Sequence, residues 1–290
     1  MYRRIVIGWD GGAEAHDALA LAGLLRAPDA AGVAACVVSD AEPPAATHWR
    51  DALISTKVAW VDPRAIRGRS AAKGLHQCAE GMNADLIVVG SSRSEDVGRL
   101  VPGSVADGLV YEAPCALAVA PKGFRDVATD LRVVAVAYDG SKESARGLEE
   151  AAGIAGSAGA SLRLVGIVSP LEVGRTDLLY HPRRSPEQAF ERRRADLLRF
   201  LREAAESVPD ELRPEVVVAE GQPGDMIVRE AWNGTNLLVI ASRVSASARG
   251  VVAGGTAIEV MRRAPCPVVV VPGGPEAPNG AGRSRFTAPA

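Results

Sequence analysis

The chain has 290 residues, of which 47 % are hydrophobic and only 4 % aromatic, and its formal net charge is −2. This length suits two domains, and the near-neutral charge argues against binding to nucleic acid or to an anionic membrane. Because there is no apolar run of about 18 residues and no apolar signal core at the N-terminus, we expect a cytoplasmic protein without a membrane span.

The first half alternates apolar runs with segments of helical spacing. The predicted strands are Arg4–Trp9, Val33–Ser39, Lys57–Val61, Leu86–Val89 and Ala116–Ala120. The predicted helices are Glu14–Leu25, Ser70–Gly81 and Ser104–Glu112, with at best a short helix around Thr47–Ser55.

The second half repeats this order. Its predicted strands are Leu131–Ala137, Ser161–Val168, Glu215–Ala219, Leu237–Ile240 and Pro267–Val271, and its predicted helices are Glu143–Ala158, Pro186–Val208, Asp225–Trp232 and a segment after Gly254. Asp10 and Asp139 lie 129 positions apart, whereas Gly103 and Gly254 lie 151 apart. The 22 additional residues of the second half therefore fall between its second and fourth strands, where the long helix lies.

Strands and helices that alternate with short loops predict an α/β fold with mainly parallel sheets covered on both faces. We expect two tandem, doubly wound, five-stranded sheets of order 3-2-1-4-5. The predicted domains are residues 1–124, with a shortened second helix, and 129–273, followed by a disordered tail at 274–290. The short helix should leave one face of the second and third strands bare, to be covered by the other half, a second chain or a ligand.

The loop after the fourth strand carries the most informative chemistry. Gly90 ends a buried strand, Ser91 offers a hydroxyl, and Gly103-Ser104 opens a helix whose first amides can face an anion. The sequence contains no Gly-x4-Gly-Lys-Ser/Thr and no Gly-x-Ser-x-Gly, so an ordinary P-loop NTPase and a serine hydrolase elbow are excluded. Cys36, Cys78, Cys115 and Cys266 form no Cys-x-x-Cys pair, and no metal site is predicted.

The spacing Gly90-x2-Arg93-x9-Gly103-Ser104 resembles the Gly-x2-Gly-x9-Gly-Ser/Thr motif of the universal stress protein family. The ADLIVVG and APC segments, the Asp after the first strand and the tandem layout resemble that family too, across about residues 3–121 and 131–272. This resemblance implies an adenine nucleotide alpha hydrolase-like fold and a stress-response regulator that binds ATP, ADP or AMP, with Mg²⁺ if the ligand is a triphosphate.

The resemblance also implies the site residues. In the first half, the adenine side would be formed at Asp10 and Val37, and the phosphates and ribose would be held by Gly90, Ser91, Arg93, Gly103, Ser104 and Val105. A second site, ranked below the first, would comprise Asp139, Ile167, Ala241, Ser242, Gly254, Gly255 and Thr256.

Three departures from the motif affect these sites. Arg93 replaces the second glycine, where its side chain could obstruct phosphate or bind it directly. Ala241 and Val244 replace both loop glycines of the second half, and neither residue takes a positive φ as readily as glycine does. For Asp10 and Asp139, the structural alternative to a binding role is capping of the following helix.

Two other functions stay open. One is a nucleotide-free interaction module that acts through its sheet edge and bare face. The other, ranked lower, is an enzyme that hydrolyses ATP weakly, although no catalytic residue can be named. By resemblance, Ala116–Ala120 and Pro267–Val271 would pair within one chain, which also shields an exposed strand edge, and a homodimer is left open.

Overall fold

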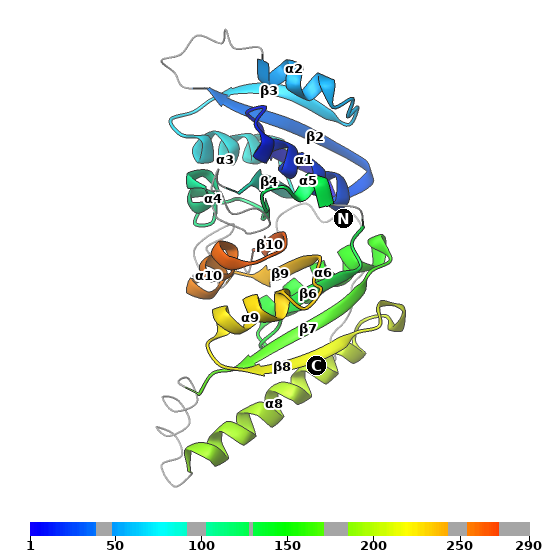
Figure 1. Ribbon diagram of the computed structural model, residues 1–290, viewed down its shortest axis with the longest axis vertical. Helices are drawn as coiled ribbons and strands as arrows, with labels where there is room; N and C mark the ends of the chain where they lie inside the picture. Colours follow the sequence, from blue (N-terminus) through cyan, green and yellow to red (C-terminus); the bar gives the residue numbers. More distant parts are fainter. Residues whose placement is uncertain (39–47, 92–102, 128–129, 171–184, 243–253, 273–290) are drawn as a thin grey trace.

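The computed structural model describes residues 1–38, 48–91, 103–127, 130–170, 185–242 and 254–272. Its strands form one sheet in the order β3-β2-β1-β4-β5-β10-β9-β6-β7-β8, which runs along the whole molecule (Figure 1). In chain order the strands are β1 (Tyr2–Gly8), β2 (Arg26–Val38), β3 (Val61–Arg67), β4 (Leu86–Gly90), β5 (Ala116–Ala120), β6 (Val133–Ala137), β7 (Ser161–Val168), β8 (Glu215–Glu220), β9 (Leu237–Ala241) and β10 (Val268–Val271).

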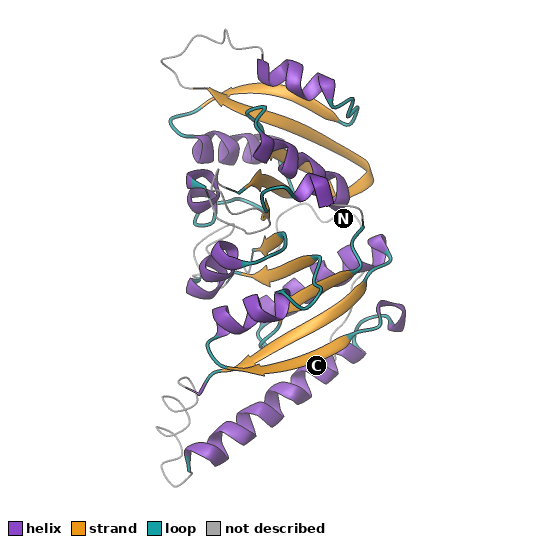
Figure 2. Cartoon of the chain, in the orientation of Figure 1, coloured by secondary structure: helices purple, strands orange, loops and turns teal. Residues whose placement is uncertain are grey.

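The helices lie on both faces of this sheet (Figure 2). They are α1 (Ala13–Leu25), α2 (His48–Ser55), α3 (Ala71–Met82), α4 (Ser104–Leu109), α5 (Phe124–Val127), α6 (Lys142–Ala158), α8 (Pro186–Glu206), η1 (Asp210–Leu212), α9 (Pro223–Ala231) and α10 (Gly255–Arg263). One core contains the buried residues of α1, α2, α6 and α8, and the other contains those of α3, α4, α9 and α10.

The predicted strand order is confirmed in each half. The first half has the order 3-2-1-4-5 with parallel pairing throughout, and β6 to β10 repeat it. The two halves meet where β10 pairs antiparallel with β5, with Val269 opposite Ala118. The expected pairing within the chain is therefore present, and it makes the two five-stranded sheets one continuous sheet. It also leaves neither strand as an exposed edge.

Two strand predictions in the first half were wrong in extent. The third strand was predicted at Lys57–Val61, but β3 begins at Val61 and continues to Arg67. Charged residues and Pro63 conceal this strand in the sequence, and both features are typical of a sheet edge, where the outer face meets water. The second strand begins at Arg26 instead of Val33, with an irregular register against the start of β1.

The short helix of the first half covers its own sheet, so the expectation of a bare face was wrong for β2. Trp49 and Leu53 of α2 are buried in the core that contains α1. The Trp9 indole Nε1 donates to the Trp49 carbonyl at 2.6 Å, and the Trp60 ring lies over Gly32 of β2. In the second half, the long α8 packs against both β7 and β8.

The connection between the halves is tied to the first helix. Asp17 of α1 is only 2 % exposed, and its carboxylate accepts from the Gly123 and Arg125 amides at 2.8 and 2.9 Å. These amides belong to the start of α5, so the buried carboxylate both caps that helix and finds hydrogen-bond partners. The tail predicted at 274–290 lies outside the described residues.

Candidate functional site

The crevice predicted in the first half lies at the carboxyl ends of β1 and β4. These strands are neighbours and run parallel, with Ile7 opposite Val88, so the loops after them open on the same edge of the sheet. Gly8 pairs with Ala35 of β2. Asp10 and Val37 each come two residues later, so they follow this pair at the same end of the two strands. The strand order reverses between β1 and β4, the position at which open α/β sheets bind ligands.

Asp10 builds the turn that leads into α1. Its Oδ1 accepts from the Gly12 amide at 2.8 Å, and Gly11 between them has φ of +81°. Asp139 repeats the arrangement, since its Oδ1 accepts from the Ser141 amide at 3.0 Å. The N-caps of the two helices are Gly12 and Ser141, so neither aspartate is itself the N-cap. Both aspartates organise the loop of the crevice, and Asp10 is exposed.

Gly90 is required by packing. A Cβ at this position would lie 2.2 Å from the Glu14 carbonyl oxygen, because α1 crosses directly over the end of β4. In the second half, Ala241 occupies the matching position and lies beside Gly147 of α6. A Cβ built on Gly147 would be 3.5 Å from the Ala241 Cβ. Neither Gly90 nor Ala241 has a positive φ. Ala241 therefore needs no positive φ, and the prediction that alanine is unfavourable at this position for that reason was wrong.

Ser91 carries an unusual hydroxyl. The residue is 6 % exposed, and its amide donates to the Ala120 carbonyl at 2.9 Å, which continues the pairing of β4 with β5. Its Oγ is buried and has no hydrogen-bond partner among the described residues. Buried polar groups are almost always hydrogen-bonded, and an unpaired one costs about 1–3 kcal/mol. A ligand oxygen in the crevice would give this hydroxyl a partner.

The remaining residues of the first site lie at the start of α4. Gly103 is its N-cap, Ser104 is exposed at the first helical position, and Val105 packs against the α3 and α4 core. Val37 packs against the same core from the end of β2. Arg93 lies outside the described residues.

The second site has the same frame with different contents. Asp139, Ile167, Ala241 and Ser242 follow or end β6, β7 and β9, and Gly254-Gly255-Thr256 begins α10. Ser242 is fully buried, and its amide donates to the Val271 carbonyl at 2.8 Å. Burial and then the neighbouring Asp139 and Glu203 carboxylates raise the pKa of the Tyr138 hydroxyl, which is therefore neutral beside this crevice. Val244 lies outside the described residues.

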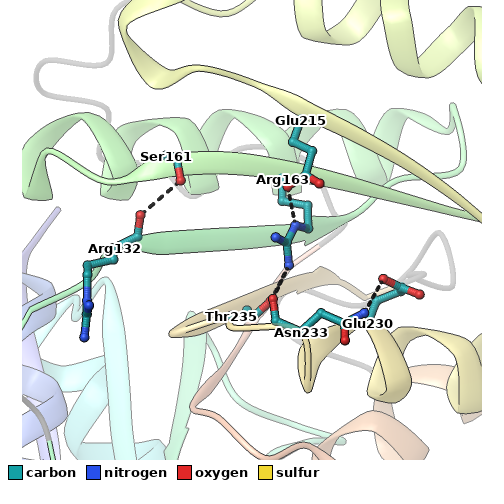
Figure 3. A network of polar contacts seen from close by, with 7 residues as sticks. All are labelled: Arg132, Ser161, Arg163, Glu215, Glu230, Asn233 and Thr235. Carbon is teal, nitrogen blue, oxygen red and sulfur yellow. Dashed lines mark hydrogen bonds and ion pairs between the residues drawn. The ribbon is translucent and has the colours of Figure 1, made fainter.

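The sequence reasoning missed a polar network on the second half (Figure 3). The Arg163 Nε donates to Glu215 at 2.7 Å, and its Nη1 donates to the Asn233 carbonyl at 2.8 Å. The Asn233 side chain donates in turn to Glu230 at 3.0 Å. The network lies near the amino ends of β7 and β8, at the edge opposite the crevice, so it joins strands and α9 and takes no part in the site.

Neither a metal cluster nor a membrane-spanning helix is found in the part of the chain that the structure describes. The described residues hold no cluster of three or more His, Cys, Asp or Glu side chains that could bind a metal ion. Within the same residues, none of the helices has the length and apolar character needed to span a membrane.

Comparisons with known proteins agree with this architecture. A Mycobacterium tuberculosis universal stress protein, Rv2319c, is 25 % identical over 211 residues, which are 71 % of this chain and 70 % of that protein. A universal stress protein from Archaeoglobus fulgidus superposes with a TM-score of 0.62 at 18 % identity, covering 93 % of this chain and 98 % of the other. PA1789 from Pseudomonas aeruginosa PAO1 superposes with a TM-score of 0.63 at 17 % identity, covering 93 % and 92 %. The family model described as "Universal stress protein family" matches residues 1–121 and 131–272, and the chain therefore belongs to this family as a tandem member.

Proposed function

We propose that this protein is a stress-response regulator that binds ATP or another adenine nucleotide in its first half. The base would lie by Asp10 and Val37. The phosphates and ribose would face Gly90, Ser91, Gly103, Ser104 and Val105, with Arg93 in the same loop, and Mg²⁺ would accompany a triphosphate. We also retain domain limits of 1–124 and 129–273 as part of this proposal.

One observation carries the proposal: the buried Ser91 hydroxyl without a described partner, at the end of β4. It lies at the reversal of the strand order, where open α/β sheets take ligands. The exposed Ser104 hydroxyl and the amides at the start of α4 are further donors to an anionic ligand. We rank the first half above the second because, in the second half, Gly254 and Gly255 are followed by threonine and Val244 replaces a loop glycine.

The direct test is mass spectrometry of the denatured purified protein together with calorimetric titration of ATP, ADP and AMP. We expect close to one nucleotide per chain. Absence of binding at millimolar ligand would instead favour the nucleotide-free interaction module. ATP turnover that is abolished by Asp10→Ala would favour an enzyme.

Ser91→Ala provides a sharper test with two readouts. Without ligand, it removes an unpaired buried hydroxyl and should stabilise the protein by about 1 kcal/mol. In the complex it removes a hydrogen bond to the ligand, which should weaken nucleotide binding about five- to tenfold. The matched control is Ser242→Ala in the second half, which should leave the affinity unchanged. Equal affinities of all three proteins would contradict the assignment of Ser91.

A further inference from the structure

A pocket outside the proposed nucleotide crevice lies at the carboxyl end of β3, the edge strand of the first half. Its volume is about 210 Å³, and it is lined by Arg67, Gly68, Arg69, Lys73 and Gln77. Arg67 ends β3, and the next two residues lead into α3, whose N-cap is Ser70. Three cationic side chains therefore surround one hollow at the N-terminal end of a twelve-residue helix.

These cations have no carboxylate partner among the residues that the structure describes. Arg67, Arg69 and Lys73 make no ion pair with any described residue, whereas Arg64 in the same strand lies 3.2 Å from Asp62. The positive end of the α3 dipole adds to the field of the three side chains. Three cations without an ion pair to a described residue thus gather at one pocket of a protein whose net charge is −2, and an anion bound there would relieve their repulsion.

The second half provides an internal comparison, because a glycine follows the edge strand there as well. The residue before Gly221 is Glu220, which is paired with Arg194 of α8 at 3.3 Å. Gln222 follows Gly221. The Met226 side chain lies against Gly221, and its Cγ would be 3.0 Å from a Cβ built on that glycine. Glu220 ends β8 as Arg67 ends β3, and Asp225 takes the place of Lys73, since both are the third residue of their helix. The fold therefore does not need a cation at either of these two positions.

We propose that this pocket binds a compact anion that bears one or two phosphate groups, such as pyrophosphate or a small phosphate monoester. Arginine guanidinium groups form paired hydrogen bonds with phosphate oxygens, and a lysine ammonium adds a point charge. At about 210 Å³ the pocket is smaller than the roughly 300–1,000 Å³ of sites for drug-sized ligands, a size that suits a compact anion.

The pocket is separate from the nucleotide crevice and is independent of the function proposed for it. The Val37 side chain lies between the pocket and the crevice. Its Cγ1 would be 3.1 Å from a Cβ built on Gly68 and 2.6 Å from a Cβ built on Gly74. Val37 stands on the proposed adenine side of the crevice. The phosphates of a bound nucleotide would lie at the loop after β4, so the two anion sites would not overlap.

The test is calorimetric titration of the full chain with sodium pyrophosphate at low ionic strength. The key variant combines Arg67→Glu, Arg69→Gln and Lys73→Met, which removes all three cations from the pocket. The matched control combines Arg193→Glu, Arg202→Gln and Arg229→Gln. These arginines are exposed, have no ion pair with a described residue, and give the same change of net charge.

We expect pyrophosphate binding by the parent and the control, an affinity reduced at least tenfold in the pocket variant, and weakening as salt is added. Circular dichroism should show that all three proteins are folded, and saturating ATP should leave pyrophosphate affinity unchanged. Three results would overturn the proposal: no binding to the parent at millimolar pyrophosphate, equal affinity in the pocket variant, or an equal loss in the control. Full competition by ATP would place the ligand in the nucleotide crevice instead, which also overturns it.

Discussion

The two halves differ in how closely the end of the fourth strand is packed against the neighbouring helix. In the first half, Gly90 on the strand leaves room for the backbone of α1 at Glu14. In the second half the strand carries Ala241, and a Cβ built on Gly147 of the neighbouring helix would meet it at an ordinary contact distance of 3.5 Å. The first half therefore requires glycine at this strand position, whereas the second half accommodates alanine there. The motif glycine is therefore explained by helix packing before any ligand is considered.

The halves differ again in how they cover the strands on the outer side. A 21-residue helix, α8, packs on β7 and β8, whereas α2 has 8 residues and relies on Trp49 and neighbouring tryptophans. The predictions below test these differences, beginning with the largest effect.

Thiol labelling should distinguish the cysteines near the exposed edge of the first half from those at the junction of the two halves. Cys36 and Cys78 are half-buried, whereas Cys115 and Cys266 are buried next to β5 and β10. Burial raises the pKa of Cys266 from 9.0 to about 12, which lowers its thiolate fraction at pH 8 about a thousandfold. Iodoacetamide followed by peptide mass spectrometry should modify Cys36 and Cys78 first. Equal labelling of Cys266 would mean that the junction opens readily.

Trp49→Ala should destabilise the protein by about 3–5 kcal/mol, because it leaves a large cavity under the short helix. Leu201→Ala, at a fully buried position of α8, should cost about 2–5 kcal/mol for the same reason. Urea unfolding followed by far-UV circular dichroism gives both values. A cost below 1 kcal/mol for Trp49→Ala would show that α2 does not seal its half.

Gly90→Ala and Gly147→Ala should have opposite signs. A Cβ on Gly90 meets backbone, so overpacking should cost about 1–3 kcal/mol or more. A Cβ on Gly147 makes an ordinary contact at 3.5 Å, and alanine in a helix interior is favoured over glycine by about 1 kcal/mol. Thermal unfolding should show one melting temperature lowered and the other raised. If both substitutions were neutral, the packing account of the two strand ends would fail.

Ser185→Ala should cost about 1 kcal/mol by removing the cap of α8. The Ser185 hydroxyl accepts from the Gln188 amide, and the Gln188 side chain accepts from the Ser185 amide, both at 3.3 Å. Ser185→Asp keeps an acceptor and is the control, expected to stay close to the parent protein. The same urea experiment measures the change. An effect of Ser185→Asp as large as that of alanine would remove capping as the cause.

Much of the fold could be predicted because it depends on local patterns. The duplicated strand order and the long helix at Pro186 follow from periodicity and from the offsets between repeated motifs. The limits of β3 could not be predicted, since an edge strand carries charged residues and Pro63 on its solvent side and lacks an apolar run. The candidate crevice could be placed from the strand order, but the unpaired Ser91 hydroxyl depends on what surrounds it.

The sequence alone determined two α/β halves of one family, because hydrophobic periodicity and glycine positions are written residue by residue. The tertiary structure decided which side chains meet across the chain. It joined the two sheets at β5 and β10, seated the tryptophans over the short half, and placed Arg67, Arg69 and Lys73 around one pocket. The reason is physical: contacts between residues far apart in sequence depend on packing geometry, which no local pattern encodes.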